Sequence, residues 1–336
     1  MKPLPWYFGD ASTGKPKKRI RPKIKNRVNR DIYNGFLRQI AHTVRDVPPP
    51  WKSTSLGRPC RDPRACVILL ELRERFQLSY EDMEAITRLS AALHHLVRAD
   101  SDERLPGHSV VHRAFFRIPM RYWRRLNRLQ LRPVPEGEAI VAIPDSTGIG
   151  TRNTSTWYDI RIHRWSTRHD HLKVHLVLVA ATGQFADFRI NRRGDATQLP
   201  ALLSTFSHVD KVPGDKAYAS HANCVAVTAK GGVPYFALKK HFSARAHGCI
   251  EWRRMVLRAW DDPVIYGIEY HERSRVESSI FSLKRRTGSR LTTRRNRRYQ
   301  ARELAAQIVA FNASQALYID LAEEIGESLW TNIECN

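Results

Sequence analysis

The sequence has few cysteines, few acidic residues and no long apolar segment. Its five cysteines are scattered and form no Cys-x2-Cys pair, which argues against a zinc ribbon and against a disulfide framework. The longest apolar run, around residues 176–181, is far too short to cross a bilayer. The first residues include Lys2 and two prolines and are followed by no apolar stretch. We therefore expect no signal peptide, and a cytoplasmic protein with reduced thiols.

The shortage of acidic residues leaves a large positive charge. The 336 residues include 56 lysines and arginines against 33 aspartates and glutamates, a net charge of +23. This excess predicts a polyanionic partner, nucleic acid before a membrane surface. Nine residues from Lys15 to Arg30 and eight from Lys284 to Arg298 are basic. We expect the first stretch to be extended or disordered until it meets phosphate, with a solubilising tail as the alternative. We expect the second to be a DNA-binding track.

The spacing of apolar residues predicts a small helical region ahead of residue 134. Residues 32–40 indicate a first helix, a second begins at Asp62, and Ser79 is a typical N-cap for a third. A basic helix follows Pro119. This order is compatible with a helix-turn-helix that binds DNA, and equally with a bundle that serves only packing.

Strands and helices alternate after that region. The predicted elements are strands at 138–144, 173–181 and 185–190, a helix at 195–206, a strand at 209–214, a helix at 221–230 and a strand at 233–238. Asp145 directly follows the first of these strands, and Asp215 follows the fourth. A charge at the end of a buried strand is costly unless a metal ion or a donor compensates it. For Asp145 alone, a turn in which it bonds the backbone of Thr147 or Gly148 is the alternative.

The most specific pattern is Tyr-x2-Arg-x3-Glu-x6-Lys, formed by Tyr270, Arg273, Glu277 and Lys284. The stretch contains no proline or glycine, so we expect one continuous helix with the other three side chains within roughly 40° of Glu277. Phe281 lies close to the same face, so we expect Glu277 to point at the interior or at a cleft. An ordinary surface ion pair between Arg273 and Glu277 is the alternative.

This pattern resembles the signature of the DDE transposases of prokaryotic insertion sequences. Asp-Lys-x-Tyr at residues 215–218 agrees with the same family, whereas Ala219 stands where many relatives carry another aspartate. The resemblance covers roughly residues 138–317. It implies an α/β fold with a ribonuclease-H-like catalytic domain, in which helices flank a mixed five-stranded sheet. It also implies DNA strand cleavage and strand transfer at insertion-sequence ends.

The resemblance also implies a metal site built from three carboxylates. Asp145, Asp215 and Glu277 would be the catalytic, metal-binding triad for two Mg²⁺ ions, with Mn²⁺ as a substitute; oxygen ligands select such cations, and paired ions suit phosphodiester chemistry. The expected DNA-binding residues are Tyr270, Arg273, Lys284, Arg285, Arg286 and Arg290. A zinc site formed by His163, His169, His171 and His175 is a rival interpretation.

We therefore expect four regions along the chain. They are a basic arm with the first helix (1–50), a helix-turn-helix-like DNA-binding region (51–133), the catalytic domain (134–325) and a tail (326–336). The expected partner is double-stranded DNA, as element ends and target, bound by a homodimer in the nucleoid, with no membrane. Two other functions stay open: a nuclease of the same fold that cuts without joining, and a catalytically inactive DNA-binding protein.

Overall fold

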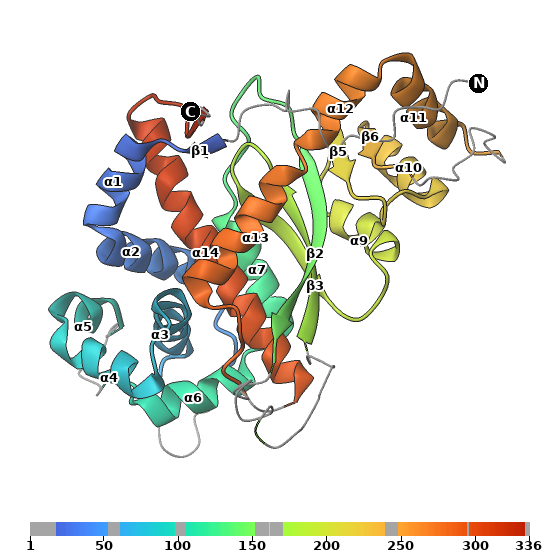
Figure 1. Cartoon of the computed structure of the whole chain (residues 1–336). Helices are drawn as coiled ribbons and strands as arrows, with labels where there is room; N and C mark the ends of the chain where they lie inside the picture. The colour runs from blue at the N-terminus through green and yellow to red at the C-terminus, as the bar shows by residue number, and fades with distance from the viewer. Residues whose placement is uncertain are drawn as a thin grey trace.

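The computed structural model describes residues 18–52, 61–97, 105–151, 161, 171–238, 248–293 and 296–332. Its first part is helical apart from β1 (Lys18–Ile20). The helices are α1 (Pro22–Arg30), α2 (Ile32–Arg45), α3 (Pro63–Phe76), α4 (Tyr80–Leu89), α5 (Ala91–Val97), α6 (His108–Arg117) and α7 (Met120–Gln130). Figure 1 shows α1 to α6 gathered on the left of the molecule and α7 nearer its middle, beside the sheet. The N-cap predicted at Ser79 is confirmed, because its side chain accepts the backbone N–H of Asp82. The helix predicted to begin at Asp62 is also present, and the Asp62 side chain caps it by accepting the N–H of Arg64.

The second part alternates strands and helices. In order, it contains β2 (Ala142–Gly150), β3 (His171–Val179), β4 (Gln184–Ile190), the 3₁₀ turn η1 (Ala196–Gln198), α9 (Leu199–Leu203), β5 (Lys211–Gly214), α10 (His221–Thr228), β6 (Val233–Phe236), α11 (Ile250–Asp261), α12 (Pro263–His271), α13 (Ser274–Thr287), α14 (Arg297–Glu324) and β7 (Trp330–Asn332). The five predicted strands and the helix at 221–230 are present.

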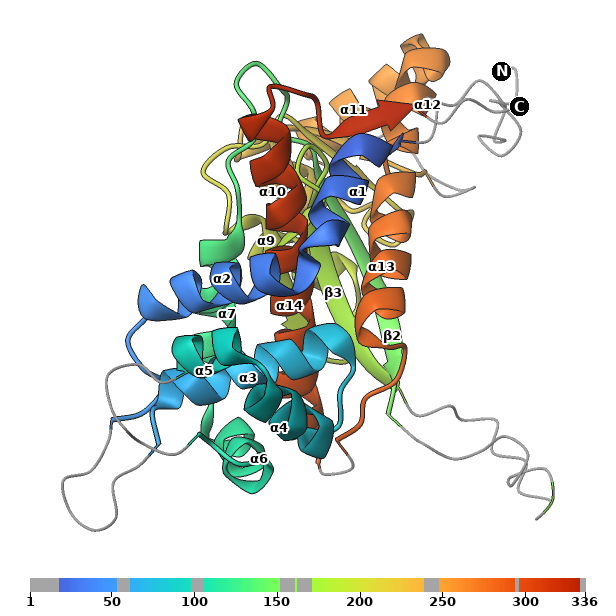
Figure 2. The same cartoon turned by 90° about the vertical axis from the view of Figure 1, so that its left-hand side faces the viewer.

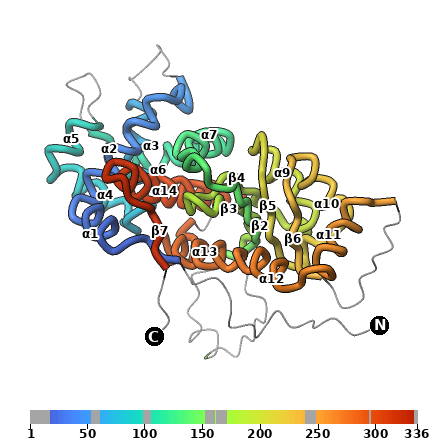
Figure 3. The backbone as a smooth tube through the Cα atoms, turned by 90° about the horizontal axis from the view of Figure 1, so that it is seen from above, coloured from blue at the N-terminus to red at the C-terminus, as the bar shows by residue number. Residues whose placement is uncertain are grey.

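The five strands are divided between two sheets. β2, β3 and β4 form an antiparallel meander, and β5 pairs with β6 in parallel. A parallel bridge between Val141 and Lys211 links the two sheets just ahead of β2. Seen from above, β5 and β6 lie beside β2 (Figure 3). The predicted hairpin is confirmed, and Gly183 at its turn has a φ of +69°, a conformation that favours glycine.

The two faces of the meander carry different cores. Along β3, Leu176 and Leu178 belong to a core shared with α13 and α14, whereas Val177 and Val179 belong to a core shared with α9, α10 and α11. This follows from the period of two in a strand, which sends neighbouring side chains to opposite faces. α14, with 28 residues, also contacts α2, α3 and α7. The helical region and the sheet therefore share one core.

β2 is longer than predicted. The expectation that the first strand ends at Pro144 is wrong, because β2 runs on to Gly150 and pairs with β3 throughout. At Gly150, the last residue of β2, the chain also bonds residues 289–291. The N–H of Gly150 donates to the carbonyl of Ser289 (3.2 Å), and the N–H of Leu291 donates to the carbonyl of Gly150 (2.8 Å). Asp145 thus lies within a strand. The alternative, a turn in which Asp145 bonds the backbone of Thr147 or Gly148, is wrong as well, since both residues are paired with β3.

The basic stretch near the N-terminus is folded along residues 18–30. We expected an extended or disordered arm; instead β1 pairs antiparallel with β7, and α1 follows it. Ile24 is fully buried in a small core with Tyr318 and Leu321 of α14. One apolar face is enough to fix this helix, although most of its residues are polar. Lys15 lies outside the described residues.

Within the described ranges, no helix combines the length and the apolarity needed to cross a membrane. The three cysteines that fall in these ranges, Cys66, Cys224 and Cys249, are buried and are not in disulfides.

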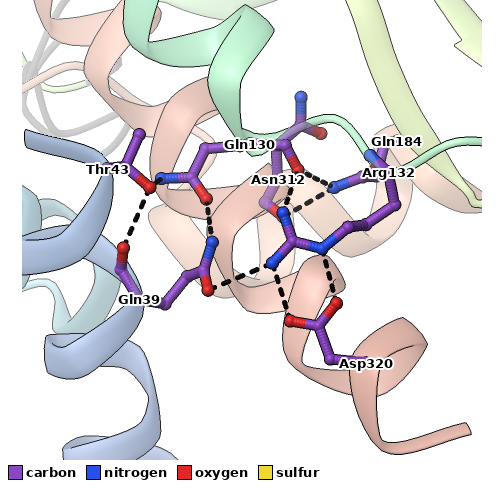
Figure 4. Close-up of polar contacts among 7 residues, drawn as sticks. All are labelled: Gln39, Thr43, Gln130, Arg132, Gln184, Asn312 and Asp320. Atoms are coloured by element: carbon purple, nitrogen blue, oxygen red, sulfur yellow. Dashed lines mark hydrogen bonds and ion pairs between the residues drawn. The ribbon is translucent and has the colours of Figure 1, made fainter. Parts of the chain in front are cut away.

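A network of buried amides ties the helical region to the sheet (Figure 4). Gln184 of β4 is fully buried. Its Nε2 donates to the carbonyls of Gln130 (2.8 Å) and Asn312 (3.1 Å), and its Oε1 accepts the N–H of Arg132 (2.8 Å). The Arg132 guanidinium then donates to Gln39 and, through two nitrogens, to the carboxylate of Asp320.

We predict that Gln184→Leu destabilises the protein by about 2–4 kcal/mol, because it leaves the Arg132 N–H and two buried carbonyls without this partner. Urea unfolding measures the change in the free energy of unfolding. Lys23→Ala, which removes a largely exposed pair with Glu327, is the control and should cost less than about 1 kcal/mol. Equal effects of the two substitutions would show that the network contributes nothing specific.

Candidate active site

Asp145 lies on the face of β2 that is turned toward α13. Ile143, two residues earlier in the strand, shares a core with Val276 and Ile280 of α13, and residues two apart in a strand point the same way. Burial raises the pKa of Asp145, whereas the N–H of Ser146, at 2.8 Å, and the Arg273 guanidinium lower it. The negative charges of Glu277 and Asp215 raise it further. Asp145 is therefore within electrostatic reach of both other predicted carboxylates.

Asp215 directly follows β5, as predicted. Its Oδ1 accepts the N–H of Lys216 at 2.7 Å. The bridge from Val141 to Lys211 places the start of β5 next to the start of β2. Two neighbouring strands thus deliver two carboxylates, one from inside β2 and one from the end of β5.

The helix expected to be continuous from Tyr270 to Lys284 is interrupted. α12 ends at His271 and α13 begins at Ser274. The two residues between them keep right-handed helical dihedral angles. However, the N–H groups of Arg273, Arg275 and Val276 bond to carbonyls three residues back instead of four. The chain makes a tight 3₁₀ turn here, without the glycine or proline that would have revealed it in the sequence.

Arg273 connects the signature residues across this turn. Its Nη1 donates to Oε1 of Glu277 at 2.6 Å, and its side chain also hydrogen-bonds Tyr270. Burial lowers the pKa of Arg273, but Tyr270, Glu277 and Asp215 outweigh it, so the pKa is raised overall. The i,i+4 ion pair that we considered as an alternative is present.

The expectation that Glu277 points at the interior or at a cleft is wrong. Its side chain is 54% exposed, and the neighbouring Phe281 is 67% exposed. The buried face of α13 is formed by Val276, Ile280 and Leu283. Packing of these residues rotates the helix so that Glu277 lies at the rim of the site.

Lys284 joins α13 to β2. Its Nζ donates to Oγ1 of Thr147 at 2.8 Å, and Thr147 lies two residues beyond Asp145 on the same face. Burial lowers the pKa of Lys284, while the charge of Asp145 opposes that shift. Thr147 is thus part of the site, although the sequence analysis did not single it out for this role.

The remaining basic residues of the expected DNA track point in different directions. Arg285 and Arg290 are exposed, and Arg290 is bridged to Gly150 at the end of β2. Arg286 instead lies over the rings of Phe311 and Tyr318 in α14, at 5.3 and 5.4 Å. It therefore projects away from the signature residues.

A second polar cluster, missed in the sequence, occupies the opposite face of the meander. Lys173 Nζ and His175 Nδ1 lie 2.8 and 3.0 Å from Oδ1 of Asp195. His175 is fully buried; burial lowers its pKa, although Asp195 acts in the other direction. In the rival zinc interpretation, His163 and His169 lie outside the described residues, and His175 is engaged with Asp195. Strand alternation could have revealed this cluster. His175 pairs with Ser146, the neighbour of Asp145, so both point to the face of the sheet opposite Asp145.

No ready-made metal site is present in the described part of the chain, where no three Asp, Glu, His or Cys side chains lie close enough to share an ion. The donor chemistry nevertheless suits a hard divalent cation, since all three carboxylates offer oxygen. Burial, and after it the charges of Glu277 and Asp215, raise the pKa of Asp145, and a bound cation would relieve the repulsion among these charges. Glu277, now paired with Arg273, would have to leave that partner to become a ligand.

Comparison with known families agrees with this geometry. Residues 136–313 match the family model described as Transposase DDE domain, which is more than half of the chain. The chain belongs to this transposase family. No curated protein and no solved structure matches it. Membership implies an enzyme that acts on DNA, and transposases of this family generally use divalent metal ions. The matched residues span the strands β2 to β6 and all of α13.

The raised pKa of Asp145 predicts that Asp145→Asn stabilises this transposase when divalent metal is absent. The folded protein holds the Asp145 proton more tightly than the unfolded chain does, so ionisation above the unfolded pKa of about 3.9 costs folding free energy. At pH 7 in EDTA we expect the melting temperature to rise on the order of 2 °C. The difference should vanish below about pH 3, where the carboxyl is protonated in both states.

Thermal unfolding across this pH range measures the effect. Asp261→Asn, at an exposed position in α11, is the control and should leave the melting temperature unchanged. A lower melting temperature for Asp145→Asn than for the wild type at pH 7 would contradict the expectation.

Proposed function

We propose that this transposase binds the ends of an insertion sequence and catalyses metal-dependent strand cleavage and strand transfer, with Asp145, Asp215 and Glu277 as its catalytic triad. The observation that supports this best is the coupling of the three carboxylates. The charges of Asp215 and Glu277 both raise the pKa of Asp145. The three residues are far apart in the sequence and come from a strand, a strand end and a helix. All three fall inside the matched transposase region.

We further propose that β2 to β6 act as one ribonuclease-H-like sheet. The bridge between Val141 and Lys211 supports this, as does the backbone bond from the N–H of Asp210 to the carbonyl of Ile140 (2.9 Å). In this arrangement β2 and β5 are neighbours. Such a sheet would keep Asp145 and Asp215 at a fixed separation.

In the proposed site, Asp145, Asp215 and Glu277 would hold two Mg²⁺ ions, or Mn²⁺ in their place. When bound, these ions would supply activation of water or a DNA 3′-hydroxyl and stabilisation of the leaving oxygen. Arg273 has two roles in this proposal. Without DNA it neutralises Glu277, and with DNA its planar guanidinium transfers to a backbone phosphate, which it can bind through two nitrogens.

Tyr270, Lys284, Arg285 and Arg290 would bind further phosphates of the element's end. The exposure of Arg285 and Arg290 supports this role, as does the position of Lys284 beside Thr147. The helical region before residue 134 would bind additional DNA, and a homodimer would hold the paired ends.

We predict that Asp145→Asn, Asp215→Asn or Glu277→Gln each lowers Mg²⁺-dependent cleavage of element-end DNA by about a thousandfold or more, since each removes a charge that the metal ions require. Gel assays of cleavage and of joined products measure the loss, and joined products separate a transposase from a nuclease that only cuts. Binding of the same DNA should be retained.

Asp261→Asn is again the matched control and should cleave like the wild type. Unaltered cleavage in all three triad variants would reject the proposed site. Cleavage that no tested metal supports in the wild type, combined with intact DNA binding, would favour a catalytically inactive DNA-binding protein.

Lys284→Ala tests the phosphate contact separately. We expect weaker DNA binding and a salt dependence of log K whose slope is smaller in magnitude by about one unit, as expected for the loss of one phosphate contact. Fluorescence anisotropy at several salt concentrations measures both quantities. An unchanged slope would place Lys284 outside the DNA interface.

A further inference from the structure

A groove lies on the opposite side of α13 from the signature residues. Its volume is about 270 Å³, and its lining residues come from β1, α13, α14, the β3–β4 hairpin and β7. At about 100° per residue, Arg275, Ser279, Ser282 and Arg286 lie roughly half a turn around the helix from Glu277. Figure 2 views this side, with α13 and α14 running alongside each other. The groove is therefore separate from the proposed active site.

The groove is strongly positive. Lys18, Arg19, Arg275 and Arg286 line it, and no carboxylate is found among the lining residues that the structure describes. Among the described residues, Arg275 makes a long ion pair of 3.8 Å with Glu272, and the charge of Glu138 also acts on it. The guanidinium of Arg75 lies near that of Arg286. Burial lowers the pKa of Arg75, and the positive charge of Arg286 lowers it further.

Two of these guanidinium groups have buried nitrogens without an acceptor. Nη2 of Arg275 and Nη1 of Arg286 are buried and have no hydrogen-bond partner among the residues that the structure describes. Ring stacking holds both groups in place: Arg275 lies 5.3 Å from the Trp330 ring, and Arg286 lies against Phe311 and Tyr318. A buried donor that lacks an acceptor is costly, and here two such donors belong to charged groups at one groove.

Serine hydroxyls complete the lining. Ser274, Ser278, Ser279 and Ser282 all border the groove, and Ser278 is the one that also bonds along the helix, to the carbonyl of Ser274 at 3.3 Å. Fixed guanidinium groups beside hydroxyl donors match the acceptors of a phosphate, which presents several charged oxygens to donors from different directions. We propose that this groove is a binding site for a phosphate group.

The phosphate has two possible sources with the same chemistry. It belongs either to the backbone of a DNA duplex that passes behind α13, or to a free phosphate-bearing small molecule. Neither source depends on the proposed catalytic triad. Binding is therefore measured without divalent metal and without cleavage, so that failure of this site and failure of the proposed activity give different results.

The experiment is calorimetric titration of the full chain with inorganic phosphate at fixed ionic strength. We expect saturable binding to the wild type and about tenfold or greater weakening in Arg275→Gln, because a charge-assisted contact is lost. Ser282→Asp keeps both arginines and their stacking partners but adds a negative charge, and it should weaken binding by a similar factor. Arg45→Gln, at an exposed position in α2, removes the same charge elsewhere and should bind like the wild type.

A second titration identifies the source. If a duplex of arbitrary sequence displaces phosphate, and Arg275→Gln reduces the magnitude of the salt slope of DNA binding by about one unit, the ligand is the DNA backbone. If phosphate still binds to protein saturated with duplex, the ligand is a free phosphate compound. The proposal is overturned if the wild type shows no saturable phosphate binding, or if Arg275→Gln and Ser282→Asp bind phosphate as tightly as the wild type.

Discussion

Burial of Asp145 beside two other carboxylates is the constraint on which the proposed site of this transposase depends. Asp145 sits inside a strand, partly shielded from water, with Asp215 and Glu277 close enough to disturb its ionisation. In the described structure a protein cation compensates part of this negative charge, because Nη1 of Arg273 donates to Oε1 of Glu277 at 2.6 Å. The Arg273 guanidinium thus neutralises part of the negative charge in the metal-free fold, as a divalent ion would in the proposed reaction. Arg273 therefore stabilises the metal-free fold, in addition to the DNA-binding role proposed for it.

Local sequence patterns predicted the parts of the structure that local interactions decide. The strand ending at Asp215, the hairpin around Gly183 and the N-cap at Ser79 all depend on residues within a few positions. The position of Asp145 was missed because β3 pairs with β2 as far as Gly150, where residues 289–291, far along the chain, bond the end of the strand as well. The exposure of Glu277 was missed because packing of Val276, Ile280 and Leu283 sets the rotation of α13.

Charge patterns predicted where basic residues gather but not which way they point. The run from Lys284 to Arg298 reads as one surface, yet Arg285 faces solvent while Arg286 stacks on two rings of α14. A helix turns by about 100° per residue, so neighbours in a dense basic run diverge. Both directions are positive, and the molecule therefore presents cationic features on two sides of α13.

The position of α14 in the chain affects how this protein can be made. α14 begins at Arg297, yet α2, α3, α7 and α13, which all precede it in the chain, pack against it. During synthesis these earlier helices leave the ribosome without their common partner, so their apolar faces stay uncovered until α14 has been translated. Contacts between such distant segments also form slowly. Folding of the helical region is therefore expected to wait for α14.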